Sequence, residues 1–182
     1  MLPLMQRMLL QTLPTTLSRS DRMPVFREVA RKKNALSKEE CIKLLKEEKR
    51  GVLSVMTDGE YPYCMPLNHY YDDRDGKIYF HSGRSGHKID SIGEGCKACF
   101  CVHTEGTRKE GAWALDIKSV IVFGHVRIID DPEMTEDISR RLSYKFTDDE
   151  KYIEDEIKKD LARTVLIELT IEHMTGKAVN ES

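Results

Sequence analysis

The sequence predicts a mostly β domain of the α+β class, in which an antiparallel Greek-key barrel is flanked by helices. Three observations support this fold class. Short runs of strand character recur along the chain, the early runs are separated by turns of only a few residues, and helical patterns are few. Such short turns cannot hold the crossovers that parallel strands need. The 182 residues suffice for one well-buried domain and are too few for two comfortable ones.

The N-terminal part of the chain divides into an irregular stretch and the start of the domain. Residues 1–22 follow neither a helical nor a strand period, so we expect an extension there and a single domain over residues 23–182. Ser37 and Glu40 have the spacing of a capping box, and an apolar stripe follows them. This pattern predicts a helix from about residue 38 to residue 48.

The later elements are predicted from the period of the apolar residues and from turn residues. Hairpin turns are expected at Asp58-Gly59 and across Asp72 to Gly76. We expect strands at residues 52–57, 61–71, 98–105, 119–129 and 164–173, and helices at 132–146 and 148–160. The last strand alternates cleanly between apolar and polar residues, as a strand with one buried face should.

Two prolines, Pro62 and Pro66, interrupt the strand predicted at residues 61–71. Proline has no N–H for a β-ladder and is found mainly at sheet edges and bulges. We therefore expect an edge or a bulge near Pro66. There the backbone groups of Leu67 and Asn68 would be free to bind something other than a strand.

Residues 77–95, KIYFHSGRSGHKIDSIGEG, combine a strand, a Ser/Gly-rich basic turn and a short helical pattern. Backbone N–H groups at a helix start bind anions, and basic or hydroxyl side chains strengthen such a site. Here those side chains would be Ser82, Arg84, Ser85, His87 and Lys88. The stretch suits a phosphate monoester, although it lacks the Walker A spacing. An ordinary loop with solvated basic residues is the alternative.

Composition argues against several classes of function. The net charge is −2 and the pI is about 6.3, which gives no general electrostatic footprint for nucleic acid. No apolar run approaches the length of a membrane span, and residues 1–22 lack a basic region with a clear cleavage site. We therefore expect a cytoplasmic protein with neither a nucleic-acid nor a membrane partner.

The five cysteines are expected to be thiols, mostly buried in strands, because an odd number without a secretory signal argues against a disulfide framework. Cys96 and Cys99 have the spacing of a redox or zinc pair. The residues after Cys96 have strand character, however, and no second pair with zinc-finger spacing follows. We expect no metal site.

Four segments in order resemble the flavin-binding split β-barrels of the pyridoxamine 5'-phosphate oxidase superfamily: YPYCMPLNHYY, KIYFHSGRSGHKID, KSVIVFGHVRIIDD and IEHMTGK. The resemblance covers about residues 23–177 and is nearest to the nitroimidazole-resistance-type proteins. It implies a homodimer with two FMN sites at the subunit interface. The flavin would lie against the second hairpin, with its phosphate held after the third strand.

The resemblance also implies which residues contact FMN. The hairpin segment would contribute Tyr63, Cys64, Met65, Pro66, Leu67 and Asn68, the phosphate segment His81, Ser82, His87 and Lys88, and the strand position near the flavin ring Ser119. Of the phosphate-binding positions, Lys88 is the residue that carries over unchanged. From the residues alone, a lysine in the first turn of a helix is misplaced against the dipole unless an anion sits there, and a solvated lysine is the alternative.

The function implied is a small FMN-dependent oxidoreductase that reduces a nitro or quinone type of acceptor. The chain ends EHMTGKAVNES, without the Trp-containing segment and Arg-Leu-x-Pro signature of the true oxidases, so pyridoxamine 5'-phosphate oxidase activity is not expected. The alternative is a non-catalytic protein that binds flavin or haem, with His81 as a candidate haem ligand. The flavin would carry the chemistry, and no catalytic side chain is assigned.

Overall fold

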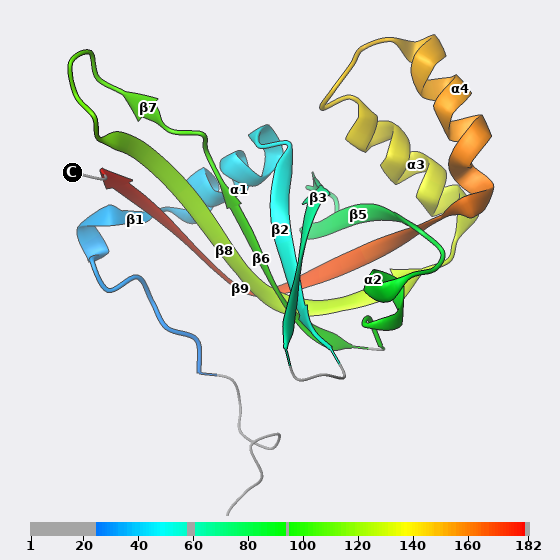
Figure 1. The fold of residues 1–182 in the computed structure, drawn as a ribbon, viewed down its shortest axis with the longest axis horizontal. Helices are drawn as coiled ribbons and strands as arrows, with labels where there is room; N and C mark the ends of the chain where they lie inside the picture. Colours follow the sequence, from blue (N-terminus) through cyan, green and yellow to red (C-terminus); the bar gives the residue numbers. More distant parts are fainter. Residues whose placement is uncertain (1–24, 58–60, 94, 181–182) are drawn as a thin grey trace, which may run out of the picture.

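The computed structural model describes residues 25–57, 61–93 and 95–180, which form one curled antiparallel sheet with helices around it (Figure 1). The helices are α1 (Lys38–Glu47), α2 (His87–Asp90), α3 (Pro132–Ser143) and α4 (Glu150–Asp160), with short 3-10 turns at Lys32–Asn34 and Leu161–Arg163. The strands are β1 (Ala35–Leu36), β2 (Arg50–Met56), β3 (Pro62–Asn68), β4 (Tyr70–Asp72), β5 (Lys77–Gly83), β6 (Cys96–His103), β7 (Thr107–Arg108), β8 (Leu115–Ile129) and β9 (Thr164–Asn180). The predicted split β-barrel with flanking helices is confirmed.

The strand order is β3-β2-β6-β8-β9-β5-β4, with β1 beside β9 and β7 beside β8. The long strands β8 and β9 run across the whole molecule, and α3 and α4 lie together at one end of it (Figure 1). A register shift between Phe123 and Gly124 marks a bulge in β8. Gly124 is required there, because a Cβ atom would lie 1.9 Å from the carbonyl oxygen of Thr170.

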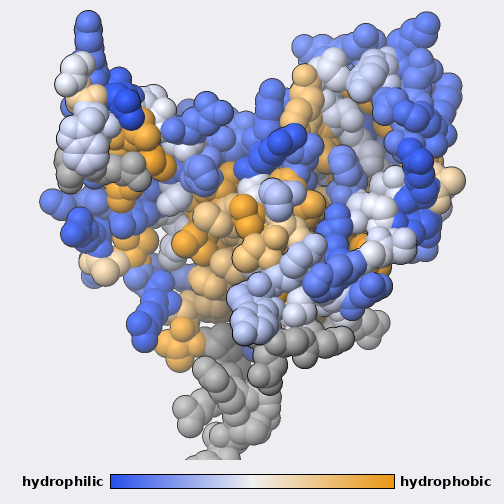
Figure 2. Space-filling view, viewed as in Figure 1, coloured by the Kyte–Doolittle hydropathy of each residue, from blue (hydrophilic) through white to orange (hydrophobic). Residues whose placement is uncertain are grey.

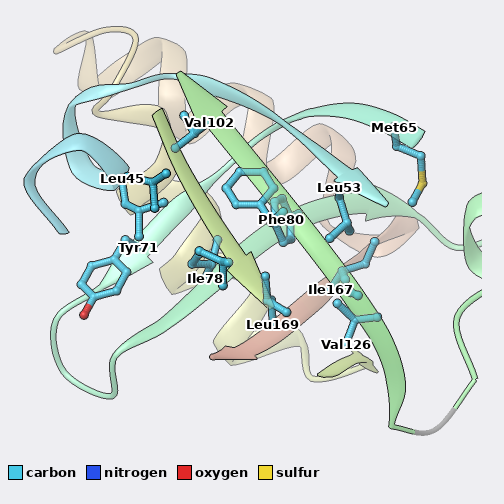
Figure 3. Packing of buried hydrophobic residues seen from close by; sticks show 14 of the residues in the cluster. Leu45, Leu53, Met65, Tyr71, Ile78, Phe80, Val102, Val126, Ile167 and Leu169 are labelled. Carbon is cyan, nitrogen blue, oxygen red and sulfur yellow. The ribbon is translucent and has the colours of Figure 1, made fainter. Parts of the chain in front are cut away.

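The core fills the inside of the curled sheet, where alternate residues of the strands meet (Figure 3). In β2, Leu53 and Val55 point inward and are almost completely buried. The rings of Phe80 and Phe100 meet edge to face, with centroids 5.1 Å apart. In β2 and β6 the opposite face is left for other contacts. β5 and β9 differ, because Tyr79 and Leu166 on their other face pack with Ile138 of α3 in a second cluster, so the single buried face predicted for the last strand is wrong over its first half.

A polar corner closes the barrel where α1 ends. The ammonium group of Lys145 donates to the carbonyl oxygens of Leu45 (3.2 Å), Glu48 (2.5 Å) and His69 (3.1 Å). The buried His69 ring places Nε2 2.8 Å from the Leu45 oxygen, so Nε2 carries the proton. Burial, and then the charge of Lys145, lower the pKa of His69 to about 3. Burial also lowers the pKa of Lys145 to about 8.

Several predictions about individual elements can be compared with the structure. The capping box of Ser37 and Glu40 is present, and α1 follows it as expected. β3 lies at the edge of the sheet, as the prolines predicted, but the interruption expected at the prolines is wrong: its register with β2 is continuous through Pro62 and Pro66, without a bulge. An edge strand can hold proline because a nitrogen that faces away from the ladder need not donate. The strand predicted at residues 61–71 is instead divided at His69 into β3 and β4, which stand at opposite ends of the strand order. The extension at residues 1–22 and the turn at Asp58-Gly59 lie outside the described residues.

Candidate functional site

The predicted anion-binding stretch forms β5, the turn after it and α2. Alternate residues of β5 face opposite sides of the strand. Ser82 follows the inward positions and is buried, whereas His81 lies on the other side, next to α3 and α4. At Gly86 the chain takes a φ of 108°, which favours glycine, and it then enters α2. His81 and Ser82 therefore do not point at a common spot.

Lys88 is the unusual residue of this stretch. Its side chain is half-buried, and it makes no hydrogen bond or ion pair with any described residue. Burial lowers the pKa of Lys88, and no anionic group in the described part of the chain offsets that effect. The charge of Lys88 also adds to the effect of burial in lowering the pKa of His81, although part of the His81 side chain reaches solvent. Lys88 is thus a partly desolvated cation without a counter-charge among the residues that the structure describes.

The expected convergence of the stretch on one anion is only partly present. Arg84 is engaged elsewhere, through two contacts of 2.7 and 2.8 Å with the Asp130 carboxylate and one of 2.9 Å with the carbonyl oxygen of Ala162. Ser82 donates its hydroxyl proton to the carbonyl oxygen of Gly83, 3.0 Å away. α2 has only four residues, so its dipole is small. Arg84 and the helix dipole therefore do not contribute to an anion site as predicted. Lys88 is left as the main candidate to bind an anion.

A stacked pair of rings joins α2 to the edge strand. The rings of Tyr63 and His87 lie 4.3 Å apart and nearly parallel. Two segments that are far apart in the sequence, and that were both predicted to bind the cofactor, therefore meet at this pair. Within β3 the side chains alternate: Met65 is buried in the core, whereas Cys64 and Pro66 are exposed on the outer face. Met65 can therefore offer only its backbone to a ligand at the edge.

The outer face of β2, β6 and β8 is unusually apolar for a surface. Val52, Met56, Ile121 and Phe123 are exposed there, with 38 to 52% of each residue accessible. Figure 2 shows hydrophobic residues gathered at the middle of the molecule, where Figure 1 places β2, β3 and β6. Contiguous exposed apolar residues mark interaction surfaces.

Three thiols belong to the same outer face. Cys64 is exposed and lies 3.1 Å from the hydroxyl of Ser54, and Cys99 and Cys101 are half-buried. All five cysteines are free thiols, as predicted, but the expectation that the strand cysteines are buried is wrong: Cys64 is exposed, and Cys96, Cys99 and Cys101 are half-buried. The reason is the period of the strands, which turns Cys64 outward beside the buried Met65 in β3 and places Cys99 and Cys101 on the face opposite Phe100 in β6.

Ser119 lies far from the phosphate stretch of its own chain. Ser82 pairs with Val165 and Ser119 with Lys177, twelve positions further along β9. At about 3.3 Å per residue, this is roughly 40 Å along the strand. Asn68, on the edge strand, accepts a hydrogen bond of 3.0 Å from Arg50. The structure thus joins β3 with α2 but leaves Ser119 apart from both.

An aromatic contact near Ser119 was not predicted. The Phe26 ring stacks on His173 at 4.7 Å and lies 5.8 Å from the Phe123 ring, so the segment before α1 covers part of the outer face. The Nε2 atom of His173 is buried without a hydrogen-bond partner among the described residues. The sequence signal was weak, because Phe26 is an isolated aromatic residue in a basic segment.

Neither a metal-binding cluster nor a membrane-spanning helix is found in the described ranges. Among residues 25–57, 61–93 and 95–180, no group of three or more His, Cys, Asp or Glu side chains is arranged to hold a metal ion. No helix in this part of the chain is long and apolar enough to cross a membrane.

Comparison with known proteins defines the class. The model of the family described as pyridoxamine 5'-phosphate oxidase matches residues 37–178, so the chain belongs to that family. No match is found among curated proteins.

Solved structures share the fold at low sequence identity. A protein assigned to 5-nitroimidazole antibiotic resistance in Bacteroides thetaiotaomicron is 18% identical, with a TM-score of 0.65 over 80% of this chain and 87% of that one. An FAD-binding protein of Mesorhizobium loti is 23% identical, with a TM-score of 0.58 over 80% and 96% of the two chains. An FAD- and haem-binding protein of Mycobacterium smegmatis is 19% identical, with a TM-score of 0.61 over 78% and 70%. These likenesses show the fold.

Proposed function

We propose that the protein binds FMN between two identical subunits and acts as a cytoplasmic oxidoreductase that reduces a small acceptor of the nitro or quinone type. The observation that carries this proposal is Lys88, a half-buried cation with a lowered pKa and no anionic partner among the described residues. A phosphate dianion would supply the missing counter-charge through a charge-assisted hydrogen bond. The similar folds of proteins described as FAD-binding support a flavin as the carrier of that phosphate.

The surroundings of Lys88 fit the rest of such a cofactor. The Tyr63–His87 pair joins the loop to the edge strand, and β3 has no neighbouring strand on its outer side among the described strands. Backbone groups of an edge strand are available to hydrogen-bond the polar rim of a planar ring. The loop at Lys88 and Ser82 would then hold the phosphate, and β3 from Tyr63 to Asn68 would position the ring system.

A second copy of the chain would complete the site. Ser119 lies too far along β9 to reach a flavin whose phosphate is held at Lys88 of the same chain. The exposed apolar residues between these two regions, including Val52 and Ile121, suit a subunit interface. In a homodimer, Ser119 of the second copy would come to the ring held by the first.

The bound flavin would supply the electron-transfer chemistry through its ring. The residues of the chain would bind and orient it: Lys88 holds the phosphate charge, and the outer face excludes water once it is covered. This division of roles requires no side chain as a general base, and we assign none.

The proposal is tested by purification followed by an absorbance scan and a titration with FMN. We expect either a yellow protein or saturable binding of added FMN, and a particle of twice the chain mass in light scattering. A colourless protein that binds no added FMN would overturn the cofactor assignment, and a flavin-loaded monomer would overturn the shared site.

A non-catalytic flavin- or haem-binding protein is the second candidate. It is favoured by His81, whose lowered pKa keeps the imidazole neutral and able to ligate iron. Turnover of NAD(P)H with a nitro compound or a quinone would decide for the enzyme. A Soret band that is formed on haem addition and persists in His81→Ala would exclude ligation through His81.

A further inference from the structure

A cavity of about 350 Å³ lies between the α3–α4 pair and the sheet, on the side of β5 opposite Ser82. α3 and α4 lie together at this end of the molecule (Figure 1). The volume of the cavity is in the range of small-molecule sites. The proposed flavin site does not use this cavity, and the two share only His81.

The charged side chains that line this cavity are all acidic. Glu156 and Asp160, both on α4, contribute carboxylates, and no described lysine or arginine lines the cavity. Their own partners, Lys159 and Arg163, extend into solvent with 61 and 70% of their side chains exposed. Exposed ion pairs of this kind are weak, so a bound cation can take over either carboxylate.

The hydroxyl groups of the cavity add acceptors. Ser143 donates its proton to the carbonyl oxygen of Ser139 at 2.8 Å, and Thr164 donates to that of Asp160 at 2.7 Å. Their oxygen lone pairs are then left for a donor in the cavity. Ser139 and Thr147 also line it and are neutral.

An aromatic side chain gives the cavity a flat apolar wall. Tyr152 is 57% exposed and lines the cavity, as does Phe146. The ammonium group of Lys49 lies 5.3 Å from the centre of the Phe146 ring, so that ring already contacts a cation. Tyr152 is therefore the ring left for a ligand.

We infer that this cavity is a binding site for a planar organic amine in its protonated form. Its aromatic part would stack on Tyr152, and its ammonium group would bind the Glu156 carboxylate. The site would select against anions, whereas Lys88, in the segment after β5, would attract them.

The experiment compares three probes of similar shape by calorimetry with the full-length protein at pH 7: naphthylmethylamine, naphthylmethanol and naphthoate. We expect the amine to bind roughly ten-fold more tightly than the alcohol, because a charge-assisted contact is added, and the carboxylate not to bind. Glu156→Gln should remove this roughly ten-fold preference and leave binding of the alcohol unchanged. Tyr152→Ala should weaken the amine and the alcohol alike.

Glu154→Gln is the matched control. Glu154 lies on the same helix and pairs with Lys158 at 2.7 Å, as Glu156 pairs with Lys159 at 3.0 Å, but it does not line the cavity. Equal affinity for all three probes, no binding of the amine, or equal losses in the two variants would overturn the inference. Flavin binding is not needed for this test, so its result is independent of the proposed cofactor.

Discussion

The two half-buried lysines Lys88 and Lys145 lie in opposite surroundings. Burial lowers the pKa of both. Lys145 donates to three carbonyl oxygens at the end of α1, whereas Lys88 has no partner among the described residues. Desolvating a cation is unfavourable unless hydrogen bonds or counter-charges compensate. Lys145 therefore stabilises the fold, whereas Lys88 destabilises it. This difference is the basis of our proposal that Lys88 binds an anion.

Removing Lys145 should have the largest effect on stability. Lys145→Met leaves the carbonyl oxygens of Glu48 and His69 without their donor, which should lower the free energy of unfolding by about 2–3 kcal/mol. Urea denaturation at pH 7 measures the change. Lys151→Met, at an exposed position of α4, is the control and should change little. An equal, small effect of both variants would contradict the structural role of Lys145.

Acid should unfold the protein through His69, in the same corner. The pKa of His69 is about 3 in the folded protein and about 6.5 in the unfolded chain, so the unfolded chain binds more protons below pH 6.5. Stability is therefore lost as the pH falls from 6.5 toward 3, by about 2 kcal/mol between pH 7 and pH 5.

The matching variant is His69→Gln, whose amide can replace Nε2 as the donor to Leu45. Between pH 7 and pH 5, the free energy of unfolding of His69→Gln should fall by about 2 kcal/mol less than that of the wild type. A wild-type protein with the same slope as the variant would show that His69 is not buried in its neutral form.

Removing Lys88 should change stability in the opposite direction to removing Lys145, and by the smallest amount. Lys88→Met deletes a half-buried cation that has no partner in the described ranges, so the free energy of unfolding of the flavin-free protein should stay the same or rise by up to ~1 kcal/mol. Urea denaturation beside Lys145→Met shows the contrast directly. A loss comparable to that of Lys145→Met would mean that Lys88 contributes to the fold.

Local signals in the sequence were enough for most of the fold. The capping box at Ser37 located α1, and the turn after Asp72 placed β4 beside β5. The continuity of β3 through Pro66 was missed because the ladder to β2 tolerates proline when its nitrogen faces away from the sheet.

The site was harder to predict because it depends on contacts between distant residues. Arg84 reads as part of an anion site, yet Asp130, 46 residues away, holds its guanidinium group. Ser119 reads as part of the same site as Lys88, but the length of β9 separates them. Spacing along the chain cannot report either fact, because both follow from the pairing of strands.

The central claim, that Lys88 awaits a phosphate, is tested most directly by titrating wild type and Lys88→Ala with FMN and with riboflavin. Removing a charge-assisted contact worth about 1.5–3 kcal/mol should weaken FMN binding roughly ten- to hundred-fold. Riboflavin lacks the phosphate, so its affinity should hardly change, and the preference for FMN should collapse. Ser82→Ala, which removes a neutral hydroxyl that also donates to Gly83, should reduce FMN affinity less. Equal losses for both ligands, or an unchanged FMN affinity in Lys88→Ala, would contradict the account.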